Sequence, residues 1–85
     1  MKRLPPLTGL EAFIQVARLG SIKAAAAELN LSMPALSRRV QGLEQAIGQP
    51  LFDRHHQALK LTETGKALQA RLGPALDDLQ AALDS

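Results

Sequence analysis

Hydrophobic residues and helix-ending residues alternate along the chain in a pattern that predicts four helices. The first carries its hydrophobic residues at helical spacing, at Leu10, Phe13, Ile14 and Ala17. Thr8 begins a capping box at the start of this helix, and Gly20 offers its end. A second helix of roughly two turns begins at the cap Ser21 and ends at Leu29, since Asn30 tolerates the left-handed conformation that ends helices.

The third predicted helix begins after Ser32, which can cap it, and ends at Gly48-Gln49-Pro50. Its side chains divide into two opposed sets on a helical projection. One narrow stripe holds Leu36, Val40, Leu43 and Ile47. The opposite face holds Pro34, Arg38, Gln41 and Gln45, with Ser37 and Gly42 at its margins. The pattern predicts a helix with one buried face and one small, polar and basic face.

The pattern changes after Pro50. Residues 51–54 and 58–61 form short stretches separated by the polar tripeptide His55-His56-Gln57, which predicts a small β-hairpin. Thr62 then caps a last helix with a stripe of leucines at helical spacing, Leu68, Leu72, Leu76, Leu79 and Leu83. Because proline removes a helical hydrogen bond, we expect a kink at Gly73-Pro74.

Length and composition narrow the classes of protein. A chain of 85 residues has room for one domain with a modest core. It contains no cysteine, and no run approaches the ~20 apolar residues of a membrane span, so we expect a cytoplasmic protein without a disulfide framework. The chain has two Phe and no Trp or Tyr, so it has few aromatic side chains on which the bases of single-stranded nucleic acid could stack. All ten Lys and Arg lie within residues 1–72, and residues 73–85 carry only acidic charges.

The order of helix, helix, tight turn, helix, hairpin and long helix is that of a mainly α-helical winged helix-turn-helix domain. Such a domain places its third helix in the major groove of DNA. There Arg38 can pair with guanine, Gln41 with adenine, and Met33 or Pro34 can contact a thymine methyl. Backbone amides at the helix starts after Ser21 and Ser32 can hold phosphates.

These residues resemble the N-terminal DNA-binding domain of LysR-type transcriptional regulators over Leu10 to Gly65. The resemblance is carried by Ala12-Phe13, Val16-Ala17, Gly20-Ser21, the alanines before Leu29, Ser32, Pro34-Ala35-Leu36-Ser37-Arg38, Leu43-Glu44, Gly48, Pro50-Leu51-Phe52, Arg54, Leu61-Thr62 and Gly65. It implies a bacterial regulator that binds promoter DNA as a dimer or tetramer. It also implies a linker helix that pairs subunits, and a further domain, outside these residues, that senses a small-molecule effector.

Carried over position by position, the resemblance implies DNA contacts from Pro34, Ser37 and Arg38, from Arg54 at the wing, and from Ser21 near the backbone. The chain departs from the family pattern at three places: Met33 replaces a glutamine, Ile22-Lys23 replaces Phe-Thr, and the wing reads His56-Gln57-Ala58 in place of Gly and Arg. The full set of expected DNA-binding residues is Ser21, Lys23, Ser32, Met33, Pro34, Ser37, Arg38, Gln41, Arg54, His55, His56 and Gln57. We expect residues 1–61 to form the DNA-binding domain and residues 62–85 to begin the dimerisation helix.

Several features have a second interpretation. Asp53, His55 and His56 suggest a metal site, but adjacent histidines point apart, so we favour wing-tip donors or an inert loop and expect no metal or cofactor. Arg39 lies nearer the core edge and has a structural or phosphate-contacting role. The leucine stripe could fold back on the domain instead of forming a dimer. A winged-helix module that binds protein is the alternative function. Catalysis is not expected, because the sequence has no Cys, no Gly-rich phosphate-binding loop and no pair of carboxylates set against a His.

Overall fold

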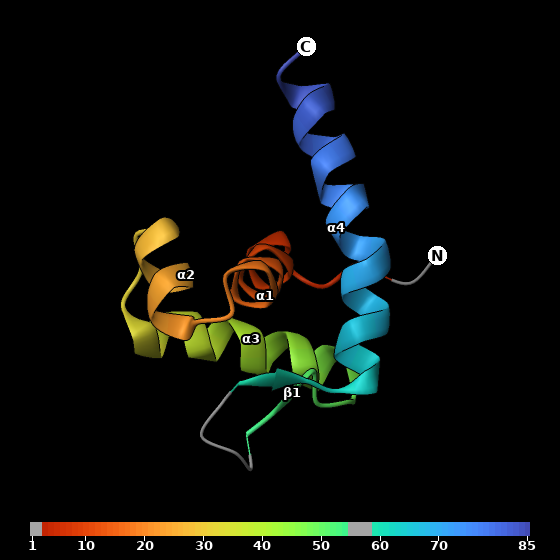
Figure 1. Ribbon diagram of the computed structural model, residues 1–85. Coiled ribbons are helices and arrows are strands. Elements are labelled where there is room, and N and C mark those ends of the chain that lie inside the picture. The colour runs from red at the N-terminus through yellow and green to blue at the C-terminus, as the bar shows by residue number, and fades with distance from the viewer. Residues whose placement is uncertain (1–2, 55–58) are drawn as a thin grey trace.

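The computed structural model describes residues 3–54 and 59–85. Figure 1 shows three helices grouped around one core, a short hairpin below them and a long fourth helix that rises past the core to the C-terminus. The elements are α1 (Leu7–Leu19), α2 (Ile22–Glu28), α3 (Met33–Ile47), β1 (Phe52–Asp53), β2 (Lys60–Leu61) and α4 (Glu63–Leu83). The two strands pair antiparallel, with Phe52 opposite Leu61 and Asp53 opposite Lys60. The predicted winged helix-turn-helix fold is confirmed.

The core lies where α1 crosses α3 and where the hairpin begins. Its residues are Ala12, Phe13, Ile14, Val16, Ala25, Ala26, Leu36, Val40, Leu43, Leu51 and Phe52. The rings of Phe13 and Phe52 lie 5.5 Å apart between centroids, in the tilted arrangement that aromatic pairs favour. This contact joins the base of the wing to α1, so the hairpin is part of the same packed unit as the three helices.

Three of the four predicted helix starts are confirmed by their hydrogen bonds. The hydroxyls of Ser21, Ser32 and Thr62 accept from the backbone N–H of the residue three positions on in α2, α3 and α4. Thr8 was expected to cap α1, and this is wrong: α1 begins at Leu7, and Pro6 occupies the cap position. The Pro6 carbonyl accepts from the backbone N–H of Gly9 at 3.1 Å, which starts the helix one residue before Thr8.

The structure corrects the expectation for Ile47 and refines the expectations for the two strands and for Pro74. Ile47, expected on the buried stripe of α3, is 38% exposed, and it is the last residue of that helix. The strands are shorter than the predicted stretches, and Ala58 lies outside the described residues. Pro74 lies inside α4 without ending it, and the helix continues to Leu83.

Within the described residues, no helix has the length and apolar character needed to cross a membrane.

The junction between the wing and α4 is closely packed. The Thr62 hydroxyl donates to the Pro50 carbonyl at 2.8 Å, and the Thr62 N–H donates to the Leu51 carbonyl at 3.0 Å. Gly65 is buried directly against that Leu51 carbonyl, where an added Cβ would overlap the oxygen and lie 2.9 Å from the Leu61 Cδ2. The absence of a side chain at Gly65 therefore lets the first turn of α4 seat on the base of the wing.

Substituting Gly65→Ala should lower the free energy of unfolding by about 3 kcal/mol, because the Leu51 backbone must move to admit the methyl group. Urea denaturation at fixed protein concentration measures this loss. Gly42→Ala is the matched control, since a Cβ there meets nothing within 4 Å and alanine favours a helix interior by ~0.5–1 kcal/mol. Equal stability of the Gly65→Ala variant and the wild type would contradict the close packing at this junction.

Candidate nucleic-acid interface

The turn between α2 and α3 is fixed by local hydrogen bonds. Asn30 adopts the expected left-handed conformation, with φ of 57°, and the Leu31 N–H donates to the Ala26 carbonyl at 2.8 Å. Ser32 then begins α3, its hydroxyl 3.2 Å from the Ala35 nitrogen. The Ser21 hydroxyl accepts from the Ala24 N–H at 3.1 Å in the same way. These short-range contacts set the direction in which α3 leaves α2.

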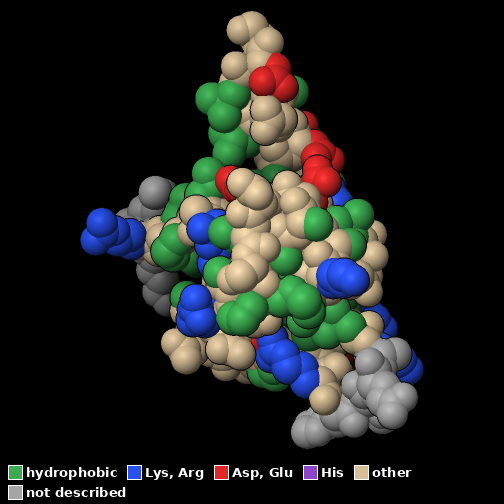
Figure 2. All heavy atoms as spheres, turned by 90° about the vertical axis from the view of Figure 1, so that its left-hand side faces the viewer, with side chains coloured by type: hydrophobic (Ala, Val, Ile, Leu, Met, Phe, Trp, Pro, Cys, Tyr) green, Lys and Arg blue, Asp and Glu red, His purple; other side chains and the backbone are tan. Residues whose placement is uncertain are grey.

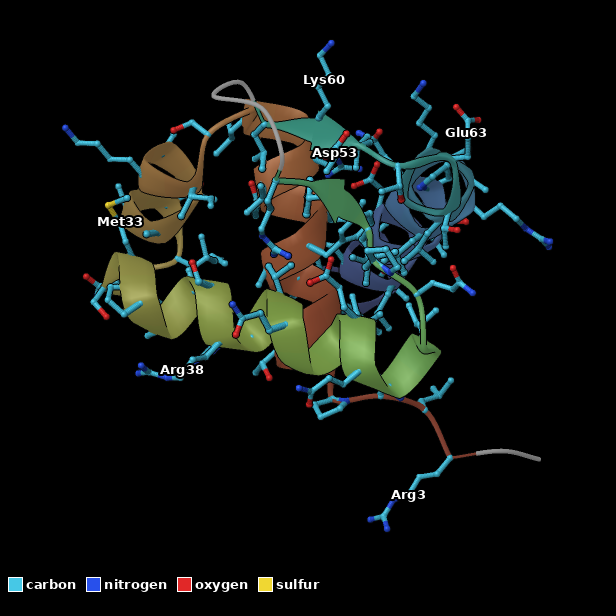
Figure 3. All side chains as sticks on the ribbon, turned by 90° about the horizontal axis from the view of Figure 1, so that it is seen from below. Arg3, Met33, Arg38, Asp53, Lys60 and Glu63 are labelled. Atoms are coloured by element: carbon cyan, nitrogen blue, oxygen red, sulfur yellow. The ribbon has the colours of Figure 1, made fainter. Side chains whose placement is uncertain are left out.

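The outer face of α3 holds the residues expected to contact DNA. Leu36, Val40 and Leu43 are buried, and the side chains on the opposite side are left to solvent. Pro34, Arg38 and Gln41 are exposed, Met33 is 48% exposed, and Ser37 is half-buried. Figure 3 shows Arg38 projecting away from α3, and Met33 at the start of α3 beside α2. Lys23 is exposed on α2.

Arg38 differs from Arg18 and Arg54 in that no carboxylate of the described residues pairs with its charge. Arg18 pairs with Asp77 at 3.0 Å, and Arg54 pairs with Glu44 at 3.0 Å. Among the described residues, Arg38 forms no ion pair. Arg39 is half-buried beside Pro5, Pro6 and Gly9, as its position near the core edge predicted. The guanidinium of Arg38 therefore keeps its donors for a ligand outside the chain.

The wing residue Arg54 is held by a side chain that the sequence analysis did not single out. Glu44, on α3, accepts from the Arg54 guanidinium through Oε1 and from the Leu51 N–H through Oε2, at 2.7 Å. The sequence placed Glu44 within the family resemblance, as part of Leu43-Glu44, but no role was predicted for it. His55, His56 and Gln57, the other expected wing contacts, lie outside the described residues. Over residues 3–54 and 59–85, no group of three or more potential ligands could hold a metal ion.

The leucine stripe of α4 divides into two parts. Leu68, Leu72 and Leu76 are half-buried and pack against the core of their own chain. Leu79 is 43% exposed and Leu83 is 72% exposed. Both line a groove between α1 and α4 together with Leu7, Ile14 and Leu76. Packing on the domain thus accounts for the first half of the stripe and leaves the second half uncovered.

Charge is distributed unevenly over the surface. Figure 2 shows Lys and Arg side chains over the lower and middle parts of the molecule, and Asp and Glu side chains toward the upper end, where α4 ends. The second half of α4 carries Asp77 and Asp78, Asp84 caps its end, and no basic residue lies among residues 73–85. A polyanion such as DNA is therefore attracted to the end of the molecule that holds α3 and is repelled from the end of α4.

The exposed basic face of α3, the tight turn before it and the adjacent hairpin define a winged helix-turn-helix domain. Residues 7–66 match the family model described as bacterial regulatory helix-turn-helix protein, lysR family. The chain is 42% identical over 82 residues to an HTH-type transcriptional regulator in the ibpB-leuC intergenic region of Azotobacter vinelandii, covering 93% of this chain and 57% of that protein. It is also 42% identical over 77 residues to the HTH-type transcriptional regulator TrpI of Pseudomonas aeruginosa, covering 91% of this chain and 26% of that protein.

A solved structure extends the comparison to three dimensions. The BenM DNA-binding domain in complex with catB site 1 DNA superposes with a TM-score of 0.86 at 28% identity, covering 93% of this chain and 89% of that one. The chain belongs to the lysR family of bacterial regulatory helix-turn-helix proteins and is the DNA-binding domain of a LysR-type transcriptional regulator. It spans about half the length of the Azotobacter relative and about a quarter of TrpI.

Replacing Ser32 with alanine should lower the free energy of unfolding by about 1 kcal/mol, because the Ala35 N–H loses its acceptor at the start of α3. Thermal denaturation followed by circular dichroism measures the change. Ser37→Ala, one turn further along α3, is the control and should shift stability by less than ~0.5 kcal/mol, since Ser37 caps no helix. An unchanged melting temperature for Ser32→Ala would argue against this cap.

Proposed function

We propose that residues 1–61 bind double-stranded DNA in a sequence-specific manner, with α3 in the major groove. The observation that carries the proposal is the outward face of α3, where Arg38 is exposed and unpaired among the described residues, directly opposite the buried stripe. A helix enters the major groove when such a face carries side chains that reach base edges without bulky obstruction. The likeness to the BenM domain, which was solved with DNA, supports this placement.

The contacts divide by chemistry into base readout and backbone positioning. Arg38 and Gln41 have the donors and acceptors for guanine and adenine, and Met33 and Pro34 offer apolar surface to a thymine methyl. Ser37, between these residues, is small enough to let α3 approach the bases. Phosphates are met by the helix starts at Ser21 and Ser32, by Lys23, and by the wing with Arg54, His55, His56 and Gln57.

The uncovered half of the leucine stripe is the basis for a homodimer formed through residues 62–85. Leu79 and Leu83 are exposed in the second half of α4, and a second copy of the helix would remove their apolar surface from water. The half-buried Leu68, Leu72 and Leu76 then support the interface from within the domain. A dimer presents two copies of α3 to the two half-sites of a promoter sequence.

The whole regulator, of which this chain is one domain, is proposed to act in the cytoplasm as a non-catalytic transcriptional regulator, as a dimer or a tetramer of its full-length form. Its relatives TrpI and the Azotobacter protein are transcriptional regulators and extend beyond the matched region. A small-molecule effector would bind in that additional part. Within the present residues, the function to test is DNA recognition.

Replacing Arg38 with alanine should weaken binding to duplex DNA about tenfold and lower the slope of log affinity against log salt concentration by up to ~1. Fluorescence anisotropy on a mixed-sequence duplex across a salt series gives both quantities. Arg71→Ala removes the same charge from the exposed surface of α4 and should change both values much less. Equal effects of the two substitutions would show that Arg38 acts only through net charge, and no DNA binding by the folded wild type would favour the protein-interaction alternative.

Replacing Leu79 and Leu83 together with alanine should dissociate the dimer without unfolding the domain, because both side chains lie largely outside the core. Sedimentation velocity gives the mass, and circular dichroism gives the helix content. Leu4→Ala is the control, since Leu4 is 73% exposed, as Leu83 is, but precedes α1. A variant that keeps the mass of the wild-type dimer would rule out this interface.

A further inference from the structure

Glu44 joins the recognition helix to the wing through both of its carboxylate oxygens. Oε2 accepts from the backbone N–H of Leu51 at 2.7 Å and of Phe52 at 3.4 Å. Oε1 accepts from the Arg54 Nη1 at 3.0 Å. The carboxylate therefore performs two separable tasks: one oxygen fastens the start of β1 to α3, and the other fixes a guanidinium.

The surroundings of Glu44 indicate that the second task concerns a ligand. The Glu44 side chain is only 11% exposed, whereas that of Arg54 is 44% exposed. A guanidinium has five N–H donors, and Glu44 accepts from the Nη1 end. Within the described residues, Glu44 is the one partner of the Arg54 side chain, so its remaining donors face solvent or a ligand there. Glu44 lines one shallow hollow with Gln41 and Gln45 of the polar face of α3, whereas Arg54 lines a second hollow at the base of the wing, and the ion pair connects the two.

We propose that Glu44 is a positioning residue for DNA binding, which holds the Arg54 guanidinium at the edge of the recognition face so that its free N–H groups meet a DNA phosphate. The inference rests on the proposed contact of Arg54 with DNA. A charge-assisted hydrogen bond restricts a long side chain that would otherwise sample many rotamers, so less conformational entropy is lost when the phosphate binds. In this arrangement Arg54 makes the direct contact with DNA, and the Glu44 carboxylate orients Arg54. The same division of roles is found in metal sites, where an outer-shell acceptor orients the residue that binds the metal.

The conservative variant Glu44→Gln separates the two tasks. Its single amide oxygen can still accept from the Leu51 and Phe52 N–H groups, so the wing stays fastened to α3. Its NH2 group then faces the Arg54 guanidinium, donor against donor, and the ion pair is lost. The variant should remain folded while Arg54 loses its fixed position.

A double-mutant cycle tests the inference. Wild type, Glu44→Gln, Arg54→Ala and the double variant are titrated by fluorescence anisotropy against a duplex that the wild type selects from a randomised library. We expect Arg54→Ala to weaken binding about tenfold and Glu44→Gln about fivefold, but Glu44→Gln to weaken it less than about twofold when Arg54 is already absent. Glu28→Gln removes the same charge from the exposed end of α2 and should not weaken binding, because losing a negative charge favours DNA.

The outcomes are distinguishable. Equal weakening by Glu44→Gln in both backgrounds would overturn the inference, because Glu44 would then act through the fold and not through Arg54. An unchanged affinity of Glu44→Gln would overturn it as well, while leaving the Arg54 contact in place. An unchanged affinity of Arg54→Ala would remove the contact itself and the inference with it, while the test at Arg38 would still stand. Urea denaturation of each variant establishes that the titrated protein is folded.

Discussion

The burial of one stripe of α3 against α1 determines what the rest of the domain can do. Leu36, Val40 and Leu43 are all removed from water, and together they fix the rotation of α3 about its own axis. Because helical side chains repeat every 3.6 residues, this rotation also decides that Arg38 points away from the molecule. Burying each of these three side chains contributes about 1.5–3 kcal/mol to the stability of the fold. The same burial fixes the orientation of the DNA-binding face, because α3 cannot rotate without exposing them.

A second constraint places the wing relative to that face. The segment from Pro50 to Phe52 is held by the Glu44 carboxylate, by the Thr62 hydroxyl and by the close approach of Gly65. The first two contacts are directional hydrogen bonds and the third is a steric fit, in contrast to the apolar packing between α1 and α3. Apolar packing alone would hold the hairpin near the core. The hydrogen bonds are what fix its position relative to the recognition helix α3. The wing and α3 are therefore presented to a ligand as one surface.

The local parts of this arrangement could be predicted from the sequence, and the long-range parts could not. Ser32 and the hydrophobic stripe behind it are features of one helix, and both were predicted because capping and periodicity depend on neighbouring residues. The start of α1 was misplaced because the Pro6 carbonyl, and not the Thr8 hydroxyl, accepts the first N–H group. Glu44 was missed because its partners Leu51 and Arg54 lie across the bend that follows α3, and no helical spacing connects them.

The leucine stripe of α4 shows why periodicity predicts a buried face without predicting what buries it. Gly73 is buried where α4 passes close to Ile14 and Arg18 of α1, and the Arg18–Asp77 ion pair lies one turn further along. Up to this level α1 covers the stripe, so Leu68, Leu72 and Leu76 are shielded within one chain. Beyond it Leu79 and Leu83 line an open groove between α1 and α4, and Leu83 is largely exposed. A uniform sequence pattern thus serves the fold of one chain along its first half and leaves its second half available to a second copy of the helix.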